Sequence, residues 1–250
     1  MEELEVKFHP RSALFADLSA RCTPLTKRFT DVYYEGAGYP LTTRDMWLRH
    51  RDDELELKWP AAAATAAAAT ASADASAGAA PSPAARALRP VDHYNESAGL
   101  SNIAATLLQR AGIVLPAPPP LPGGASGWLA AGGLRPFVAL TTQRSRFALL
   151  LAGSRVFVDL DRVAFPPPPG GGLQTEYMVG EVELVEAAPG RAPREALGAA
   201  LAALGVDGER PVRGKVLEYL ATHDADHWRA LSETGLLTAK LGKGWQLPTK

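Results

Sequence analysis

The amino-acid sequence predicts an α+β fold in which an antiparallel sheet dominates and helices pack on its outside. Two observations predict it. Short segments with alternating polar and apolar side chains recur along the chain, and segments with helical spacing lie mostly toward its C-terminal end. About eight such strands in succession are enough for a sheet to close into a barrel. The 250 residues suffice for one sizeable domain, so we interpret residues 1–250 as a single domain.

The expected strands are stretches of ordinary strand length in which side chains alternate with a period of two. They cover residues 2–8, 30–35, 46–51, 54–59, 136–142, 145–151, 155–161 and 176–185. Apolar residues at helical spacing predict helices over 10–20 and 100–111. Three further helices are expected, over residues 194–204, 213–221 and 224–234.

Three low-complexity stretches interrupt these elements, at residues 61–87, 115–133 and 166–172. Their Pro, Gly, Ser and Ala residues bury too little apolar surface to offset the loss of chain entropy on ordering. We therefore expect all three to be surface loop insertions, the first with some helical character because of its alanines.

The overall composition argues against several classes of protein. A net charge of −1 gives no support to bulk nucleic-acid binding or to a polybasic membrane anchor. The single cysteine, Cys22, excludes an intrachain disulfide framework and is typical of a reducing compartment. The first residues lack the features of a signal peptide, and no stretch has the ~18 strongly apolar residues of a membrane span. A cytoplasmic monomer without nucleic-acid or membrane partners is expected.

Charged side chains occupy alternate positions in the predicted strands, and residues i and i+2 of a strand share one face. The opposite parity is largely apolar, as in Leu4, Val6 and Phe8 of the first strand. The charged sets are Glu3, Glu5 and Lys7; Arg49 and Arg51; Glu56 and Lys58; Arg144 and Arg146; Asp159 and Asp161; and Glu181 and Glu183.

Two interpretations of this charged parity compete. For any single strand, the simpler one is a sheet with one face on a core and the other in water. However, these sets consist almost entirely of charged residues, and in most strands all the charges have the same sign. This separation of acidic and basic strands favours a barrel interior that binds both cationic and anionic ligands. Clustered carboxylates suit a hard divalent cation such as Mg²⁺, whereas clustered arginines and lysines suit phosphate oxygens. The pattern therefore favours a barrel that binds a metal–polyphosphate.

The segment Glu3-Leu4-Glu5-Val6-Lys7 matches the ExExK signature of the CYTH superfamily, the triphosphate tunnel metalloenzymes. Further blocks support this resemblance in order along the chain, and together they resemble the thiamine-triphosphatase branch. They are "YYE" at 33–35, "MWLRHRDDELELKWP" at 46–60, "RSRF" at 144–147, "VDLDRVAF" at 158–165, "YMVGEVELVE" at 177–186 and "GKVLEYL" at 214–220. The resemblance covers nearly all of the chain outside the three loops.

The resemblance implies an eight-stranded antiparallel barrel, a tunnel whose lumen carries the charged parity. It also implies Mg²⁺-dependent hydrolysis of thiamine triphosphate to thiamine diphosphate and phosphate. The matching metal-binding carboxylates are Glu3, Glu5, Asp159, Glu181 and Glu183. The matching triphosphate-binding residues are Lys7, Arg49, Arg51, Lys58, Arg144 and Lys215. Trp47 matches the aromatic residue placed against the thiamine, although ordinary packing explains an indole there equally well.

The sequence also departs from the family pattern. Glu35 and Gly36 follow the tyrosine pair where the family has an aspartate and then a threonine, and Asn95 replaces a usual lysine, with the possible loss of a phosphate contact. Lys7 or Lys58 is expected to activate the attacking water as a catalytic base, if neighbouring cations lower its pKa, with Tyr34 as a possible helper. Glu56 and Asp161 fit the lumen parity and are expected to support the other residues.

Other functions remain open at this point. An inorganic triphosphatase or a nucleoside triphosphatase would use the same tunnel. A class IV adenylyl cyclase shares the scaffold, but the block at 46–60 matches the thiamine type more closely. A non-catalytic module that binds polyphosphate would need the basic residues and could dispense with the acids. All five matching acids are present in the sequence, which favours an enzyme.

Overall fold

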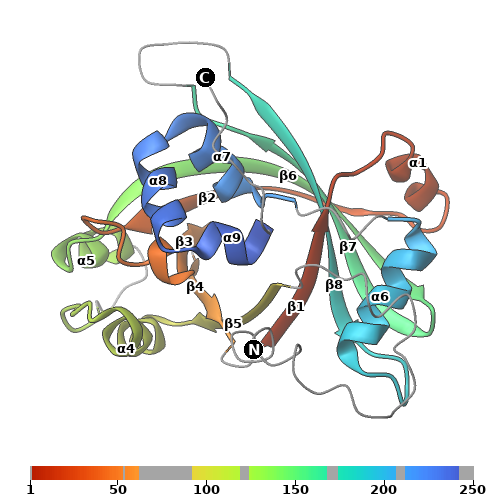
Figure 1. Ribbon diagram of the computed structural model, residues 1–250, viewed down its shortest axis with the longest axis horizontal. Helices are drawn as coiled ribbons and strands as arrows, with labels where there is room; N and C mark the ends of the chain where they lie inside the picture. The colour runs from red at the N-terminus through yellow and green to blue at the C-terminus, as the bar shows by residue number, and fades with distance from the viewer. Residues whose placement is uncertain are drawn as a thin grey trace.

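The computed structural model describes residues 2–52, 54–61, 92–118, 124–167, 174–206 and 212–241. These residues form a closed antiparallel barrel of eight strands in the order β1-β5-β4-β3-β2-β6-β7-β8 (Figure 1). The strands are β1 (Glu2–Phe8), β2 (Leu25–Glu35), β3 (Trp47–Arg51), β4 (Glu54–Pro60), β5 (Asp92–Ala98), β6 (Arg135–Leu151), β7 (Ser154–Ala164) and β8 (Glu176–Glu186). The predicted fold class is confirmed.

The helices lie outside the barrel in separate groups (Figure 1). Those that follow β8 are α6 (Pro193–Leu204), α7 (Lys215–His223), α8 (Ala225–Glu233) and α9 (Leu236–Leu241). Those that precede β6 are α1 (Leu14–Ser19), the 3₁₀ turn η1 (Thr42–Arg44), α4 (Leu100–Ala111) and α5 (Ala125–Ala131). Helix α6 packs on β1, β6, β7 and β8, and α4 packs on β4 and β5, while α7, α8 and α9 pack in sequence on one another.

The apolar parity of the strands faces these helices and forms the core. Val6 and Val182 pack with Leu197 of α6, while Leu57 packs with Ile103 of α4. A close approach between β1 and β8 requires a glycine at position 180, because an added Cβ would lie 2.2 Å from Cζ of Phe8. With the apolar side chains outward, the alternating charged side chains point into the barrel.

The barrel has eight strands, the number predicted, but only because two errors cancel: one strand was predicted as two, and another strand was not predicted. Residues 136–142 and 145–151 form one continuous strand, β6, because no turn residue breaks the run between them. Strand β5 was not predicted, because its sequence DHYNESA lacks an apolar parity. Strand β2 also begins at Leu25, earlier than the expected position 30.

The predicted loop at 115–133 is corrected by the structure, which places helix α5 within it. Trp128 and Leu129 of this helix are buried against α4 and β6, so the segment does contribute to the core. The predicted loop at 61–87 lies outside the described residues from position 62 onward, and so do residues 168–172 of the third loop. Within the described part of the chain, no helix is long and apolar enough to cross a membrane.

One buried histidine joins α8 to the segment before β3. His227 is 0 % exposed, its Nε2 lies 2.7 Å from Oγ1 of Thr42, and its ring stacks on Tyr39 at 3.9 Å between centroids. Phe137 of β6 contacts the ring edge-on. The Asp224 carboxylate lies 3.8 Å from Nδ1, which has no hydrogen-bond partner in the described structure. Burial lowers the pKa of His227 to about 4, and Asp224 only partly opposes this.

The free energy of unfolding is therefore expected to fall as the pH drops from about 6.5 to about 4. In this window the unfolded chain binds a proton that the folded chain excludes, at a cost on the order of 3 kcal/mol for a shift of this size. Urea unfolding across this range should show a flatter pH dependence for His227→Gln, which cannot titrate, than for the wild type. Equal slopes for the two proteins would contradict the assignment.

Candidate active site

The interior of the barrel holds a cavity of about 310 Å³ that is lined mainly by charged side chains. They come from strands β1, β3, β4, β5, β6 and β8 and from helices α7 and α9, so segments far apart in sequence meet there. Its cations are Lys7, Arg49, Arg51, Lys58, Arg144, Arg146, Lys215 and Lys240. Its carboxylates are Glu3, Glu5, Glu56, Asp92, Glu96, Glu181 and Glu183.

The structure brings the predicted site residues together around this one cavity. Of those residues, only Asp159 does not line it. The side chain of Asp159 is buried, with 2 % of the residue exposed, and it lies among the arginines of β6. The parity rule thus placed the charged strand residues on the interior face, whereas Lys215 of α7 was expected from the family resemblance alone. The roles of all these residues toward a metal or a phosphate remain proposals.

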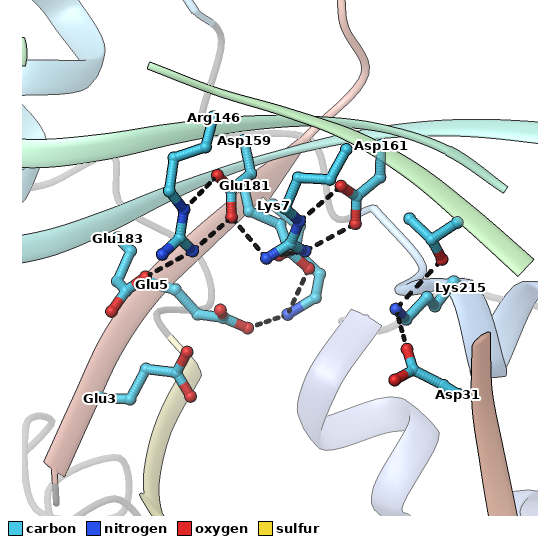
Figure 2. Close-up of polar contacts among 12 residues, drawn as sticks. Glu3, Glu5, Lys7, Asp31, Arg146, Asp159, Asp161, Glu181, Glu183 and Lys215 are labelled. Carbon is cyan, nitrogen blue, oxygen red and sulfur yellow. Dashed lines mark hydrogen bonds and ion pairs between the residues drawn. The ribbon is translucent and has the colours of Figure 1, made fainter. Parts of the chain in front are cut away.

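Strands β6, β7 and β8 carry an ordered network of arginines and carboxylates (Figure 2). Arg144 donates two hydrogen bonds to Asp161, of 2.7 and 2.6 Å, and a third of 2.9 Å to Glu181. Arg146 donates two of 2.7 Å to Asp159 and contacts Glu183 at 3.3 Å. Cross-strand pairing of β6 with β7 and of β7 with β8 places these groups opposite one another, so each guanidinium plane is fixed before any ligand binds.

A second network surrounds Asp31 of β2, a residue that the sequence analysis did not select. Its carboxylate is 0 % exposed and accepts hydrogen bonds from Arg51, at 2.6 and 3.0 Å, and from Lys215, at 2.5 Å. Arg49 lies 3.9 Å away and also contacts Glu56 at 2.5 Å. One buried carboxylate therefore holds two of the predicted phosphate-binding residues, Arg51 and Lys215, in place, while Glu56 holds Arg49.

The two lysines expected as catalytic bases are surrounded by carboxylates. Lys7 contacts Glu5 and lies 2.7 Å from Asp92 and 3.9 Å from Glu181, while Lys58 contacts Glu3. Burial alone would lower the pKa of both lysines, but Asp92 and Glu5 raise the pKa of Lys7. Glu5 and Glu3 raise that of Lys58, and Arg49 only partly opposes them. The pKa of each lysine is therefore raised and not lowered, which corrects the expectation, because the neighbouring carboxylates outweigh the neighbouring cations.

Tyr34 is also placed differently from the expectation. Its hydroxyl hydrogen-bonds to Ser126 of α5 at 2.9 Å, and its ring lies in the core between the barrel and α4. The neighbouring Tyr33 lines the cavity instead. Asn95 does not line the cavity, although its neighbours Tyr94 and Glu96 do. The expected loss of a phosphate contact at this position therefore does not apply, because a side chain at position 95 does not face the cavity. Glu35 accepts hydrogen bonds from the backbone of Gly36, Leu41 and Thr42 and so stabilises the loop before β3.

The carboxylates suit a hard cation by their chemistry. Glu3 and Glu5 of β1 and Glu181 and Glu183 of β8 line the cavity, with Glu5 opposite Glu183 in the strand pairing. Burial raises the pKa of Glu5 to about 7, Lys7 opposes this, and the charges of Glu181 and Glu3 add to it. A cation would relieve such crowding of oxygen ligands. In this structure the carboxylates contact lysines and arginines, and no three acidic, His or Cys side chains in the described ranges are grouped as a metal site.

Part of the cavity lining is apolar. It consists of Val212, Val216, Leu217 and Leu241 together with Trp47, which packs against the cluster that contains Val216, Leu217 and Leu241. The indole Nε1 donates a 2.8 Å hydrogen bond to Asp45, so the ring is held at its polar edge. The cavity thus combines a charged interior with an aromatic and aliphatic wall.

Several cavity residues were missed by the sequence analysis. Asp92, Tyr94 and Glu96 alternate along β5 and line the cavity, so the period-two rule applied to polar residues alone would have found them. The same rule pairs Tyr33 of β2, which lines the cavity, with the fully buried Asp31 beside it. Lys240 carried no such signal, because it lies on a short helix whose position against the barrel depends on the tertiary structure.

No protein-family model and no curated protein matches the sequence. Solved structures with a similar fold include a putative adenylate cyclase from Bacillus halodurans, which is 17% identical over 87% of this chain and 96% of that chain, with a TM-score of 0.45. They also include the putative adenylyl cyclase HpAC1 from Hippeastrum, described as having a dominant triphosphatase activity, at 14% identity over 88% and 96%, with a TM-score of 0.47. A protein from Pyrococcus horikoshii is 14% identical over 83% and 92%, with a TM-score of 0.45. Similarity at this level does not bear on the activity of this chain.

Proposed function

We propose that the barrel binds a triphosphate and hydrolyses it with Mg²⁺, and that thiamine triphosphate is the substrate. The observation that carries this proposal is the convergence of Arg and Lys side chains with carboxylates in one interior cavity. Such a set of cations matches a polyanion with several oxygens, and the accompanying carboxylates are the ligands that Mg²⁺ prefers.

The chain's own residues are assigned the following roles. Arg49, Arg51 and Arg144 present guanidinium groups that Asp31, Glu56 and Asp161 already orient, so they can grip phosphate oxygens without a large loss of side-chain freedom. Lys7, Lys58 and Lys215 add positive charge along the same path. Lys7 and Lys58 line the cavity beside these arginines, so both are assigned the role of phosphate ligands.

Glu3, Glu5, Asp159, Glu181 and Glu183 would hold Mg²⁺, whose charge would offset that of the terminal phosphates and favour attack by water on the γ-phosphorus. This role of the carboxylates does not depend on the identity of the organic group. Mg²⁺ binding would explain why acids are present in a cavity for an anion, since a purely basic cavity would bind the phosphates without them.

The apolar part of the cavity lining supports an organic triphosphate over an inorganic one. Trp47 and the aliphatic side chains beside it offer an aromatic face to a planar heterocycle, and a thiazolium cation over an indole gains a cation–π interaction. Inorganic tripolyphosphate would leave this wall without a partner.

The test is phosphate release in Mg²⁺ with thiamine triphosphate, tripolyphosphate and ATP, compared as kcat/KM. A preference of about 10²-fold for thiamine triphosphate is expected, the order of magnitude that a stacked ring and its surrounding contacts supply. A preference for tripolyphosphate would retain the triphosphatase activity and overturn the thiamine assignment.

A polyphosphate-binding module without catalysis is the second candidate. The ion pairs that bind the predicted metal carboxylates to lysines and arginines favour it. Tight binding of tripolyphosphate without phosphate release at any Mg²⁺ concentration would support this function over the enzyme.

A further inference from the structure

We propose that Asp45 is a positioning residue that fixes Trp47 and thereby determines whether the cavity prefers a heterocyclic triphosphate to bare tripolyphosphate. This inference rests on the proposed function, because it concerns the organic part of the same substrate. Asp45 does not line the cavity, so it acts through the residues that do.

The Asp45 carboxylate is contacted by three residues of the cavity wall. Its Oδ1 accepts hydrogen bonds of 2.8 Å from Nε1 of Trp47 and 2.8 Å from the hydroxyl of Tyr94. Its Oδ2 lies 3.2 Å from Nζ of Lys240. Three donors on three separate elements leave this carboxylate little capacity for a ligand, which points to a structural task next to the cavity.

The backbone of Asp45 lies in the left-handed region, where residues other than glycine are uncommon. The residue follows η1 and has a φ of 59° and a ψ of 32°. Its side-chain contacts offset the energetic cost of this conformation and hold the carboxylate two residues before Trp47, the first residue of β3. Glycine would adopt the same backbone without strain, so the carboxylate can be removed without disturbing the main chain.

A chain of contacts joins Asp45 to Lys7, one of the proposed phosphate ligands. Lys240 of α9 also donates to Asp92 at 3.1 Å, and the other oxygen of Asp92 lies 2.7 Å from Nζ of Lys7. Lys240 further contacts the Tyr94 hydroxyl. The chain of contacts from Trp47 through Asp45, Lys240 and Asp92 to Lys7 sets the indole and the first phosphate-binding lysine at a fixed separation, as recognition of a ring joined to a phosphate chain requires.

The test uses Asp45→Gly, which removes the carboxylate while glycine accepts the left-handed backbone. We expect kcat/KM for thiamine triphosphate to fall about tenfold, mainly through KM, as for the loss of a hydrogen bond from a positioned group. We expect kcat/KM for tripolyphosphate to stay within about twofold, because no phosphate ligand is removed. Asp45→Asn keeps an oxygen acceptor for Trp47 and should recover most of the loss.

The matched control is Asp52→Gly. Asp52 also has a left-handed φ, of 51°, but its carboxylate pairs with Lys27 on the surface, at 2.8 Å. This variant should retain the wild-type ratio of the two kcat/KM values. If Asp52→Gly changed this ratio as much as Asp45→Gly does, the proposal would be overturned. The effect of Asp45→Gly would then come from the introduced glycine and not from the loss of the carboxylate.

A double-mutant cycle separates positioning of Trp47 from a general structural role. Phe at position 47 retains an aromatic ring but has no Nε1, so in a Trp47→Phe background Asp45→Gly should lower kcat/KM for thiamine triphosphate by less than about twofold. A full tenfold effect in that background, or an equal loss on both substrates, would overturn the proposal.

Failure of the proposed function would be distinguishable. If the wild type releases no phosphate, the same ratios are measured as dissociation constants for thiamine triphosphate and tripolyphosphate by calorimetry. A loss of discrimination in Asp45→Gly would still support the inference, and equal affinity of the wild type for both ligands would overturn it.

Discussion

Glu181→Gln is expected to lower Mg²⁺-dependent phosphate release by about 10³-fold in kcat, a loss of the size that a misplaced metal ion causes. Glu181 lies between two cations of the cavity: its carboxylate is 2.9 Å from Nη2 of Arg144 and 3.9 Å from Nζ of Lys7. Glutamine retains the size of the side chain and an acceptor for Arg144, so the change removes chiefly the negative charge. Steady-state phosphate release over a range of Mg²⁺ concentrations measures the effect.

The dependence on Mg²⁺ separates a metal ligand from a residue that only orients Arg144. If Glu181 binds the metal, the Mg²⁺ concentration for half-maximal rate should rise together with the loss in kcat. A loss of rate with no change in that concentration would instead place Glu181 in the positioning of Arg144. Full activity would remove Glu181 from the site altogether.

Glu176→Gln provides the matched control. Glu176 lies on the same strand, β8, but its partner is Arg162, at 2.7 Å, and both side chains are more than half exposed. Surface ion pairs of this kind contribute little to stability, so the control should keep wild-type activity and unfolding temperature.

The alternation of charged and apolar side chains was the informative part of the sequence, because a closed barrel has only an inside and an outside. It assigned Glu3, Glu5 and Lys7 to one face of β1, and in the structure all three line the cavity. The opposite parity, Val6 and Phe8, packs in the core with Leu197 of α6. The same rule failed for β5, where both parities are polar and the contrast that identifies a strand is missing. Polar alternation such as Asp92, Tyr94 and Glu96 therefore deserves the same weight as apolar alternation when a charged interior is suspected.

The separation of charge signs between strands has two causes in this barrel. Arginines on one strand and acids on another predict ligands of both signs. In the structure β6 and β7 are neighbours, so Arg144 faces Asp161 and Arg146 faces Asp159 directly across the strands. Part of the segregation therefore serves mutual neutralisation inside the barrel. The contribution of Lys240 depends on how α9 packs after the barrel has closed, and no local pattern in the sequence predicts such a contact.

The second large effect is expected at Asp31, on stability as well as on ligand binding. Its buried carboxylate is the common partner of Arg51 and Lys215, with Arg49 nearby. Asp31→Asn would remove the charged partner of Arg51 and Lys215, and removal of one partner from a buried pair typically costs about 3–5 kcal/mol. Urea unfolding at neutral pH should show a loss of about this size, while Asp226→Asn, at an exposed ion pair with Arg229, should show almost none.

The pH dependence of stability should also change in Asp31→Asn. Burial alone would raise the pKa of Asp31, but Lys215 and the two arginines lower it well below its usual value. The ionised carboxylate therefore contributes stability that is present above the unfolded-state pKa of about 4 and is lost as the pH falls below it. The variant should lack this part of the acid-induced loss of stability.

A polyanion should compensate for the missing carboxylate at position 31. Bound tripolyphosphate would supply negative charge to cations that the asparagine leaves unpaired, so its addition should raise the unfolding temperature of Asp31→Asn by more than that of the wild type. An equal rise in both proteins would show that the phosphate groups do not reach Arg51 and Lys215. A rise in neither would argue against anion binding in the cavity and, with it, against the triphosphate as substrate.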